Sequence, residues 1–117
     1  MNTNDAAESP IIVRKNEENH TYEATIDDQL LGLVVYEPAG ESRLVLTHAA
    51  VEHHHRNHGI ATELITSMLQ DVRRNRQTIT VYCDVVVEFL RKHPEYTDLV
   101  DPVFPGHADA AKQQSTD

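Results

Sequence analysis

The spacing of hydrophobic residues changes once along the chain, close to Gly59. Before that point it is typical of β-strands, and it predicts four of them, over residues 11–13, 20–26, 30–36 and 43–51. In the second strand Tyr22, Ala24 and Ile26 alternate with polar residues, whereas the third and fourth strands are largely apolar on both faces. Short turns separate the strands, which predicts an antiparallel meander.

After Gly59 the hydrophobic spacing becomes helical. Residues 60–72 have the apolar stripe of an amphipathic helix, and residues 78–83 alternate as a fifth strand. A second helix over residues 86–93 is stopped by Pro94. A helix between the fourth and fifth strands favours a right-handed crossover, which makes these strands parallel. The expected fold class is therefore α+β (mixed α/β), with a four-strand meander, a helix, a parallel fifth strand and a second helix.

The two ends of the chain differ from its middle. Residues 1–10 and 101–117 are small, polar and interrupted by proline, and we expect both to be flexible tails. The expected folded domain therefore covers residues 11–100. A single domain also fits the length, because 117 residues can bury one modest core.

Composition excludes several classes of protein. The chain has 10 Lys and Arg against 19 Asp and Glu, a net charge of −9, which disfavours binding to nucleic acid. It has neither a long apolar run nor a signal-peptide pattern, so we expect no membrane partner and a cytoplasmic location. Its single cysteine, Cys83, allows no intramolecular disulfide and no cysteine-based zinc site.

The segment from Glu52 to Ala61 joins the fourth predicted strand to the first predicted helix. Such a loop presents unpaired backbone N–H groups and the positive end of the helix dipole, which suit an anion. Gly59 lets the backbone approach a phosphate, and Arg56 can form paired hydrogen bonds with one. A simple tight turn would also explain Gly59, and the spacing alone favours that explanation.

The pattern Arg56-x-x-Gly59-x-Ala61 at a strand–helix junction is similar to the Arg/Gln-x-x-Gly-x-Gly/Ala signature of the GNAT superfamily of N-acetyltransferases. Three further segments resemble the short YjdJ-type branch of that superfamily: residues 47–51, Cys83 and residues 91–100. The resemblance implies a reduced GNAT-like fold, acetyl-CoA as co-substrate, and transfer of an acetyl group to an unidentified amine acceptor, either a small molecule or a protein.

The resemblance also implies where acetyl-CoA would bind. Its pyrophosphate would lie on the loop amides, and its pantetheine arm would run between the strand ending at Val51 and the strand ending at Cys83. The implied binding residues are Val51, Arg56, Asn57, His58, Gly59, Ile60 and Ala61. Three positions depart from the branch: Asn57 replaces Gly, Asp84 replaces Pro, and Ala49-Ala50 replaces Thr-Glu. The last change removes a carboxylate from a strand that often supplies the catalytic base.

Cys83 is the first candidate catalytic residue, because the resemblance places it where the fourth and fifth strands would separate. A thiolate there could accept the acetyl group. The start of the following helix favours the thiolate, whereas the adjacent Asp84 disfavours it. The alternative is a small buried residue in phase with Ile79 and Val81.

His48 is the second candidate catalytic residue. It is in phase with Leu44 and Leu46, and it is a candidate general base. The alternative is a hydrogen-bonded histidine of the core. Tyr82 alternates with Cys83, so we expect it to point to the opposite face and to serve packing.

The histidines at 53–55 and His58, with Glu52 nearby, raise the question of a metal site. Consecutive histidines in a loop point in different directions and no second cluster supplies further ligands, so we expect no metal. We interpret them instead as positive charge near phosphates.

The leading hypothesis is therefore an acetyl-CoA-dependent N-acetyltransferase, and the alternative is a non-catalytic acyl-CoA-binding or protein-interaction module. Only residues 16–19 separate the first two strands, where larger relatives place two helices over the acceptor. We therefore expect an open acceptor site, and the acidic composition favours a cationic acceptor.

Overall fold

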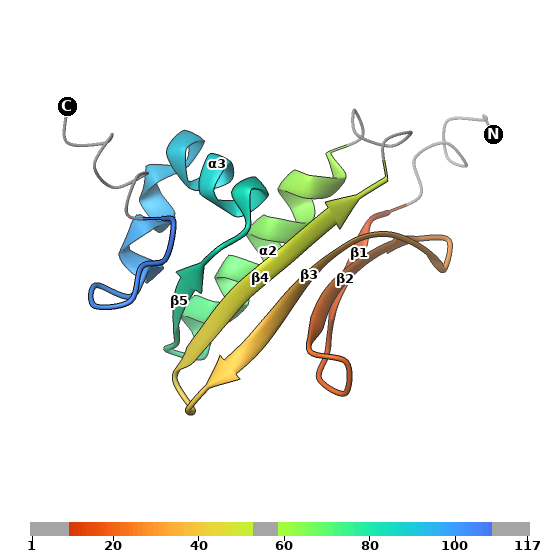
Figure 1. Cartoon of the computed structure of the whole chain (residues 1–117). Helices are drawn as coiled ribbons and strands as arrows, with labels where there is room; N and C mark the ends of the chain where they lie inside the picture. The colour runs from red at the N-terminus through yellow and green to blue at the C-terminus, as the bar shows by residue number, and fades with distance from the viewer. Residues whose placement is uncertain (1–9, 53–58, 109–117) are drawn as a thin grey trace.

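The computed structural model describes residues 10–52 and 59–108. The elements in chain order are β1 (Ile12–Asn16), β2 (Thr21–Ile26), β3 (Gln29–Ala39), β4 (Arg43–Val51), α2 (Ile60–Arg74), β5 (Thr78–Val81), α3 (Asp84–Lys92) and the 3-10 helix η2 (Pro94–Leu99). Within these residues the strands form one sheet in the order β1-β2-β3-β4-β5 (Figure 1). The first four strands are antiparallel and β5 is parallel to β4, which confirms the expected fold class.

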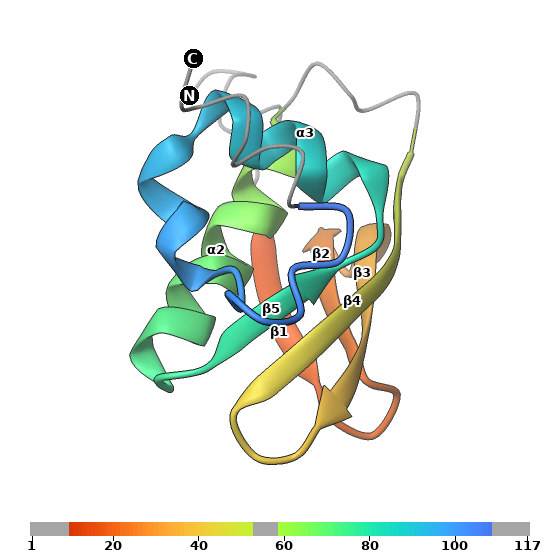
Figure 2. The same ribbon diagram turned by 60° about the vertical axis from the view of Figure 1, so that its left-hand side comes forward.

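Helix α2 covers one face of the sheet and supplies much of the core (Figure 2). Its apolar stripe is almost completely buried, through Ile60, Leu64, Ile65, Met68, Leu69 and Val72. Gly32 of β3 makes room for this helix, since a Cβ there would lie 3.3 Å from Ile60 and 3.4 Å from Leu64. No helix in the described ranges is long and apolar enough to cross a membrane.

The other face of β3 and β4 is not packed against a helix in the part of the chain that the structure describes. In Figure 1 these strands lie in front of α2, and no described helix covers their near face. The connection between β1 and β2 is a short turn over residues 17–20, in which the Asn19 N–H donates to Asn16 Oδ1 at 3.1 Å. This turn confirms that no helices stand between the first two strands.

A β-bulge in β4 changes which residues face α2. Val35 pairs with His48 and Tyr36 pairs with Leu46, so Thr47 is an extra residue on β4. Leu46 is therefore buried, whereas Thr47 and His48 are both exposed. The expectation that His48 shares a face with Leu44 and Leu46 is wrong, because the bulge reverses the alternation between them.

Residues 101–108 lie along the edge of β5 that does not pair with β4 (Figure 2). The N–H of Val81 donates to Pro105 O at 3.2 Å, and the N–H of His107 donates to Val81 O at 2.6 Å. Gly106 is required between them, because it has φ +65° and a Cβ there would lie within 3.0 Å of the Val81 backbone. The folded part thus extends at least to Ala108, beyond the boundary at residue 100 that the sequence suggested.

Candidate functional site

Strands β4 and β5 pair over a short stretch and then separate. Their register runs from Arg43 opposite Thr78 to Leu46 opposite Val81, and a last hydrogen bond joins the Tyr82 N–H to Leu46 O at 2.9 Å. Beyond it β4 continues to Val51, whereas the segment that follows β5 turns into α3 (Figure 1). We call the point where the two strands part, at Leu46 and Tyr82, the strand fork.

Beyond the strand fork, no strand among residues 10–52 and 59–108 pairs with β4 on the side that β5 has left. The N–H of Glu52 donates to Leu31 O at 2.8 Å, so Glu52 directs its backbone groups towards β3. Because backbone direction alternates along an antiparallel strand, Ala49 and Val51 direct theirs the opposite way. The edge therefore offers backbone donors and acceptors to an extended ligand, in the manner of an added strand.

The N-terminus of α2 lies at the end of this edge, across the segment 53–58. Gly59 caps the helix in a left-handed conformation (φ 75°), and no described side chain caps it. The first hydrogen bond of the helix runs from the Glu63 N–H to Gly59 O at 2.9 Å. The N–H groups of Ile60, Ala61 and Thr62 therefore have no acceptor within the helix, and together with the helix dipole they favour an anion.

Three of the expected acetyl-CoA-binding residues, Arg56, Asn57 and His58, lie outside the described residues, as do the histidines at 53–55. The other four are described. The Ile60 side chain is buried in the core, so only its backbone is available to a ligand, and Ala61 is half-buried. Within residues 10–52 and 59–108 no group of three or more His, Cys, Asp or Glu side chains is arranged to hold a metal ion.

Cys83 is the N-cap residue of α3 and belongs to the hydrophobic core, with 7% of its surface exposed. Burial raises the pKa of its thiol, and the charge of Asp84 adds to this effect, while the Val86 amide opposes it. The pKa is higher than usual in total, so burial outweighs the helix N-terminus that was expected to favour a thiolate. At neutral pH the side chain is a thiol.

His48 and Tyr82 are both exposed, on β4 and just after β5 respectively. Tyr82 is 49% exposed and meets the ring of His107 edge-on, with 5.2 Å between ring centroids. It points away from buried Cys83 as expected, but it is not part of the core. Thr47, which follows Leu46 at the strand fork, is an exposed extra residue that the sequence did not predict, since a bulge depends on strand pairing.

Comparison with known proteins gives a family. A family model described as GCN5-related N-acetyl-transferase matches residues 21–99. A search of curated proteins gives no significant match.

Among solved structures, the chain is similar to a GCN5-like protein from Staphylococcus aureus, with a TM-score of 0.60 and 18% identity over 75% of this chain and 85% of that one. It is also similar to Ard1 from Thermoplasma volcanium, with a TM-score of 0.52 and 18% identity over 63% of this chain. The match covers 53% of Ard1, so the chain spans about half the length of that protein. At these identities the two structures support the fold, while the matched model covers most of the sheet, α2 and α3. The chain belongs to the GCN5-related N-acetyl-transferase family.

Proposed function

We propose that this protein binds acetyl-CoA at the strand fork and transfers its acetyl group to an amine. Family membership supports acetyl transfer, and acetyl-CoA is the general co-substrate of the family. The observation that carries the proposal is the parting of β4 and β5 after Leu46 and Val81. Because the strands part, the backbone groups along the edge of β4 and the N–H groups at the start of α2 are available to one extended ligand.

The two features suit different parts of acetyl-CoA. The amides of the pantetheine arm would pair with the backbone of Ala49 and Val51, as an added strand does. The pyrophosphate would accept hydrogen bonds from the N–H groups of Ile60 and Ala61, beside Gly59. Arg56, Asn57 and His58 complete the proposed loop. The thioester would then lie near the strand fork.

In the proposed reaction the amine nitrogen attacks the thioester carbonyl carbon. A C–N bond forms, the C–S bond breaks, and the departing CoA sulfur takes up a proton while the nitrogen loses one. His48 is the proposed base, since its exposed imidazole is on β4 two residues from the strand fork. We favour direct transfer over an acetyl-Cys83 intermediate, because burial keeps that thiol protonated.

We further assign the chain to the short YjdJ-type branch of the family. The similarity of residues 47–51, Cys83 and residues 91–100 supports this assignment, and so does the short turn between β1 and β2. Because no helices lie between β1 and β2, the acceptor site would be open. An open site suits an acceptor too large for a closed pocket, or an exposed side chain of another protein.

A second candidate function is acyl-CoA binding without turnover. Two observations favour it: β4 contains no carboxylate, and the Cys83 thiol is buried. In that case acetyl-CoA would bind at the strand fork and no acceptor would be modified.

Titration with acetyl-CoA, followed by NMR, tests the binding site. We expect the largest amide shifts at Ala49, Val51 and Gly59 to Ala61, and small shifts at the far end of α2. Release of free CoA thiol with a panel of amines then separates the two candidates. Binding with no release from any amine would select the non-catalytic module, and unmoved resonances at millimolar acetyl-CoA would refute both.

A further inference from the structure

A segment beyond the residues that the family model matches lies beside the strand fork. The match ends at residue 99, and residues 101–108 then lie along the edge of β5 that does not pair with β4. We call residues 101–108 the edge segment. Its His107 ring meets the Tyr82 ring edge-on, with 5.2 Å between the ring centroids. The edge segment therefore contributes a side chain next to the strand fork.

The backbone of His107 is held in place on both sides. The Val81 N–H donates to Pro105 O at 3.2 Å, and the His107 N–H donates to Val81 O at 2.6 Å. Gly106, between these two bonds, has φ +65° and lies too close to the Val81 backbone for any side chain. Ala108, the next residue, is completely buried. These contacts limit where the His107 ring can lie.

The beginning of the edge segment is anchored as well. The Asp101 carboxylate accepts hydrogen bonds from the N–H groups of Val103 and Phe104, both at 2.9 Å. The Thr80 hydroxyl donates to Phe104 O at 2.6 Å, and the Arg43 guanidinium lies 4.6 Å from the centroid of the Phe104 ring. Because Arg43 belongs to β4 and Thr80 to β5, the edge segment is attached to both strands of the fork.

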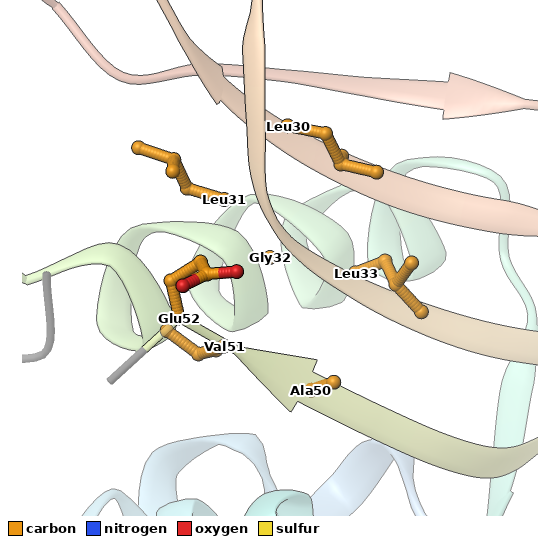
Figure 3. A pocket seen from close by; sticks show the side chains of 7 residues that line it. All are labelled: Leu30, Leu31, Gly32, Leu33, Ala50, Val51 and Glu52. Atoms are coloured by element: carbon orange, nitrogen blue, oxygen red, sulfur yellow. The ribbon is translucent and has the colours of Figure 1, made fainter. Parts of the chain in front are cut away.

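The Tyr82 side chain lies on an open face of the sheet. Its backbone N–H is fixed by the bond to Leu46 O at 2.9 Å, but the residue is 49% exposed. No helix in the described ranges covers this face, which continues to a depression of about 250 Å³ beside Leu33 and Ala50 (Figure 3). A half-exposed ring on an open face has several rotamers available, and contact with a second ring favours one of them.

We propose that His107 is a positioning residue of the acetyl-transfer site and holds the Tyr82 ring in one orientation at the strand fork. The ring then borders the space in which the acceptor meets the thioester. Without His107 the strand fork itself remains, but the ring can turn into that space, and small displacements beside reacting atoms lower the rate. This inference rests on the proposed function, since it assigns a further residue to that reaction.

Kinetics with acetyl-CoA and an amine that the wild type accepts test this role. We expect His107→Ala to lower kcat roughly two- to tenfold, as for one edge-to-face contact, with KM for acetyl-CoA within about twofold. The variant should fold, because the His107 side chain is exposed. His107→Phe keeps a ring at this position and should recover most of the lost rate.

The matched control is His93→Ala at the C-cap of α3, which removes a histidine ring stacked on Phe89 at 4.2 Å. Its kcat should equal that of the wild type. A double-mutant cycle then tests whether His107 acts through Tyr82: in Tyr82→Ala, the further change His107→Ala should not lower kcat again. An equal fall in both backgrounds, or an unchanged kcat in His107→Ala, would overturn the inference and leave the proposed function intact.

A second measurement, NMR of the Tyr82 ring protons, does not depend on turnover. We expect acetyl-CoA to shift these signals in the wild type and in His93→Ala, and much less in His107→Ala. That result without acetylation of any amine would support the positioning role and refute the transferase. Equal shifts in the wild type and His107→Ala would overturn the inference, as would a wild type whose Tyr82 signals do not respond to acetyl-CoA.

Discussion

The two ends of α2 are held in different ways. At its N-terminus, Gly59 caps the helix without a hydrogen bond from any described side chain, and three backbone N–H groups have no acceptor in the helix. At its C-terminal end, Asp71 accepts hydrogen bonds from the Tyr22 hydroxyl at 2.7 Å and from Arg74 at 2.9 Å. Arg73, also in the last turn, donates twice to Asp98, at 2.9 and 3.0 Å.

This difference separates stability from function along one helix. The hydrogen bond from the Tyr22 hydroxyl to Asp71 connects α2 to β2 and so fixes the helix on the sheet at its C-terminal end. At the N-terminal end the backbone N–H groups remain available to a ligand. Local stability is lower there, because these groups form no hydrogen bond within the helix. Substitutions at the two ends should therefore change different measurements.

The largest expected effect is a loss of catalytic rate in His48→Ala, a substitution on β4 close to the strand fork. If His48 removes the proton from the amine, kcat should fall by roughly a hundredfold or more, which is typical for loss of a general base. The free energy of unfolding should change little, because the side chain is exposed. Steady-state kinetics and chemical denaturation measure the two quantities. Partial rescue by added imidazole would support the role, and an unchanged kcat would exclude it.

At the C-terminal end of α2, we expect Tyr22→Phe to lower the free energy of unfolding by about 2 kcal/mol, since it removes the hydrogen bond to the Asp71 carboxylate. Acetyl-CoA affinity should be unchanged. Tyr36→Phe is the matched control: its ring lies 5.6 Å from that of Tyr22, it is equally buried, and no hydrogen bond of its hydroxyl occurs among the described residues. Equal losses in the two variants would show that the Asp71 bond contributes nothing.

The same pair makes stability depend on alkaline pH. Burial, and then the hydrogen bond to Asp71, raises the pKa of Tyr22 well above its ordinary value of 10.0. A group whose pKa is raised by folding contributes stability below its unfolded pKa, and that stability is lost as pH rises. Above pH 10 we expect a loss of about 1.4 kcal/mol per pH unit from this residue. Denaturation of the wild type and Tyr22→Phe at several pH values tests this, since the slope should be shallower in the variant, which keeps only the effect of Tyr36, whose pKa burial also raises.

Sequence patterns were sufficient for the order of the five strands, α2 and α3, though not for the 3-10 helix η2. Ile60 to Val72 follow one helical stripe, and Thr78 to Val81 alternate, so α2, β5 and their parallel crossover could be predicted. The position of Gly59 just before α2 followed from the same change of period. These features depend on residues that are close together in the chain, so patterns in the sequence can predict them.

Long-range pairing was not visible in the sequence. The extra residue Thr47 exists only in relation to Val35 and Tyr36 of β3, so the exposed position of His48 could not be inferred from alternation within β4. The order in residues 101–108 depends on the backbone of β5, which accepts and donates hydrogen bonds to a segment with no periodicity of its own. The raised pKa of Cys83 likewise depends on burial by distant residues.

A pair of glycines compares the N-terminal end of α2 with an unrelated turn. Gly59 and Gly40 have φ of 75° and 73°, and a Cβ at either would meet no atom of the described residues within 4 Å. Alanine at each position should therefore cost a similar amount of stability, about 1 kcal/mol, from backbone strain. Only Gly59→Ala should also weaken acetyl-CoA binding, by roughly fivefold, if strain shifts the adjacent amides. Calorimetric titration of both variants measures this, and equal affinities would remove Gly59 from the binding site.

The smallest expected effect concerns Cys83, which lies in the core close to the strand fork. Because its thiol is buried and its pKa is raised, direct transfer predicts that Cys83→Ala keeps kcat within about tenfold of the wild type. Intact mass of the wild type after incubation with acetyl-CoA should show no added acetyl group. Loss of turnover in a folded Cys83→Ala variant, together with an acetylated wild type, would establish the covalent route. The functional end of the molecule would then include a core residue, and the separation of stability from function along α2 would not extend to α3.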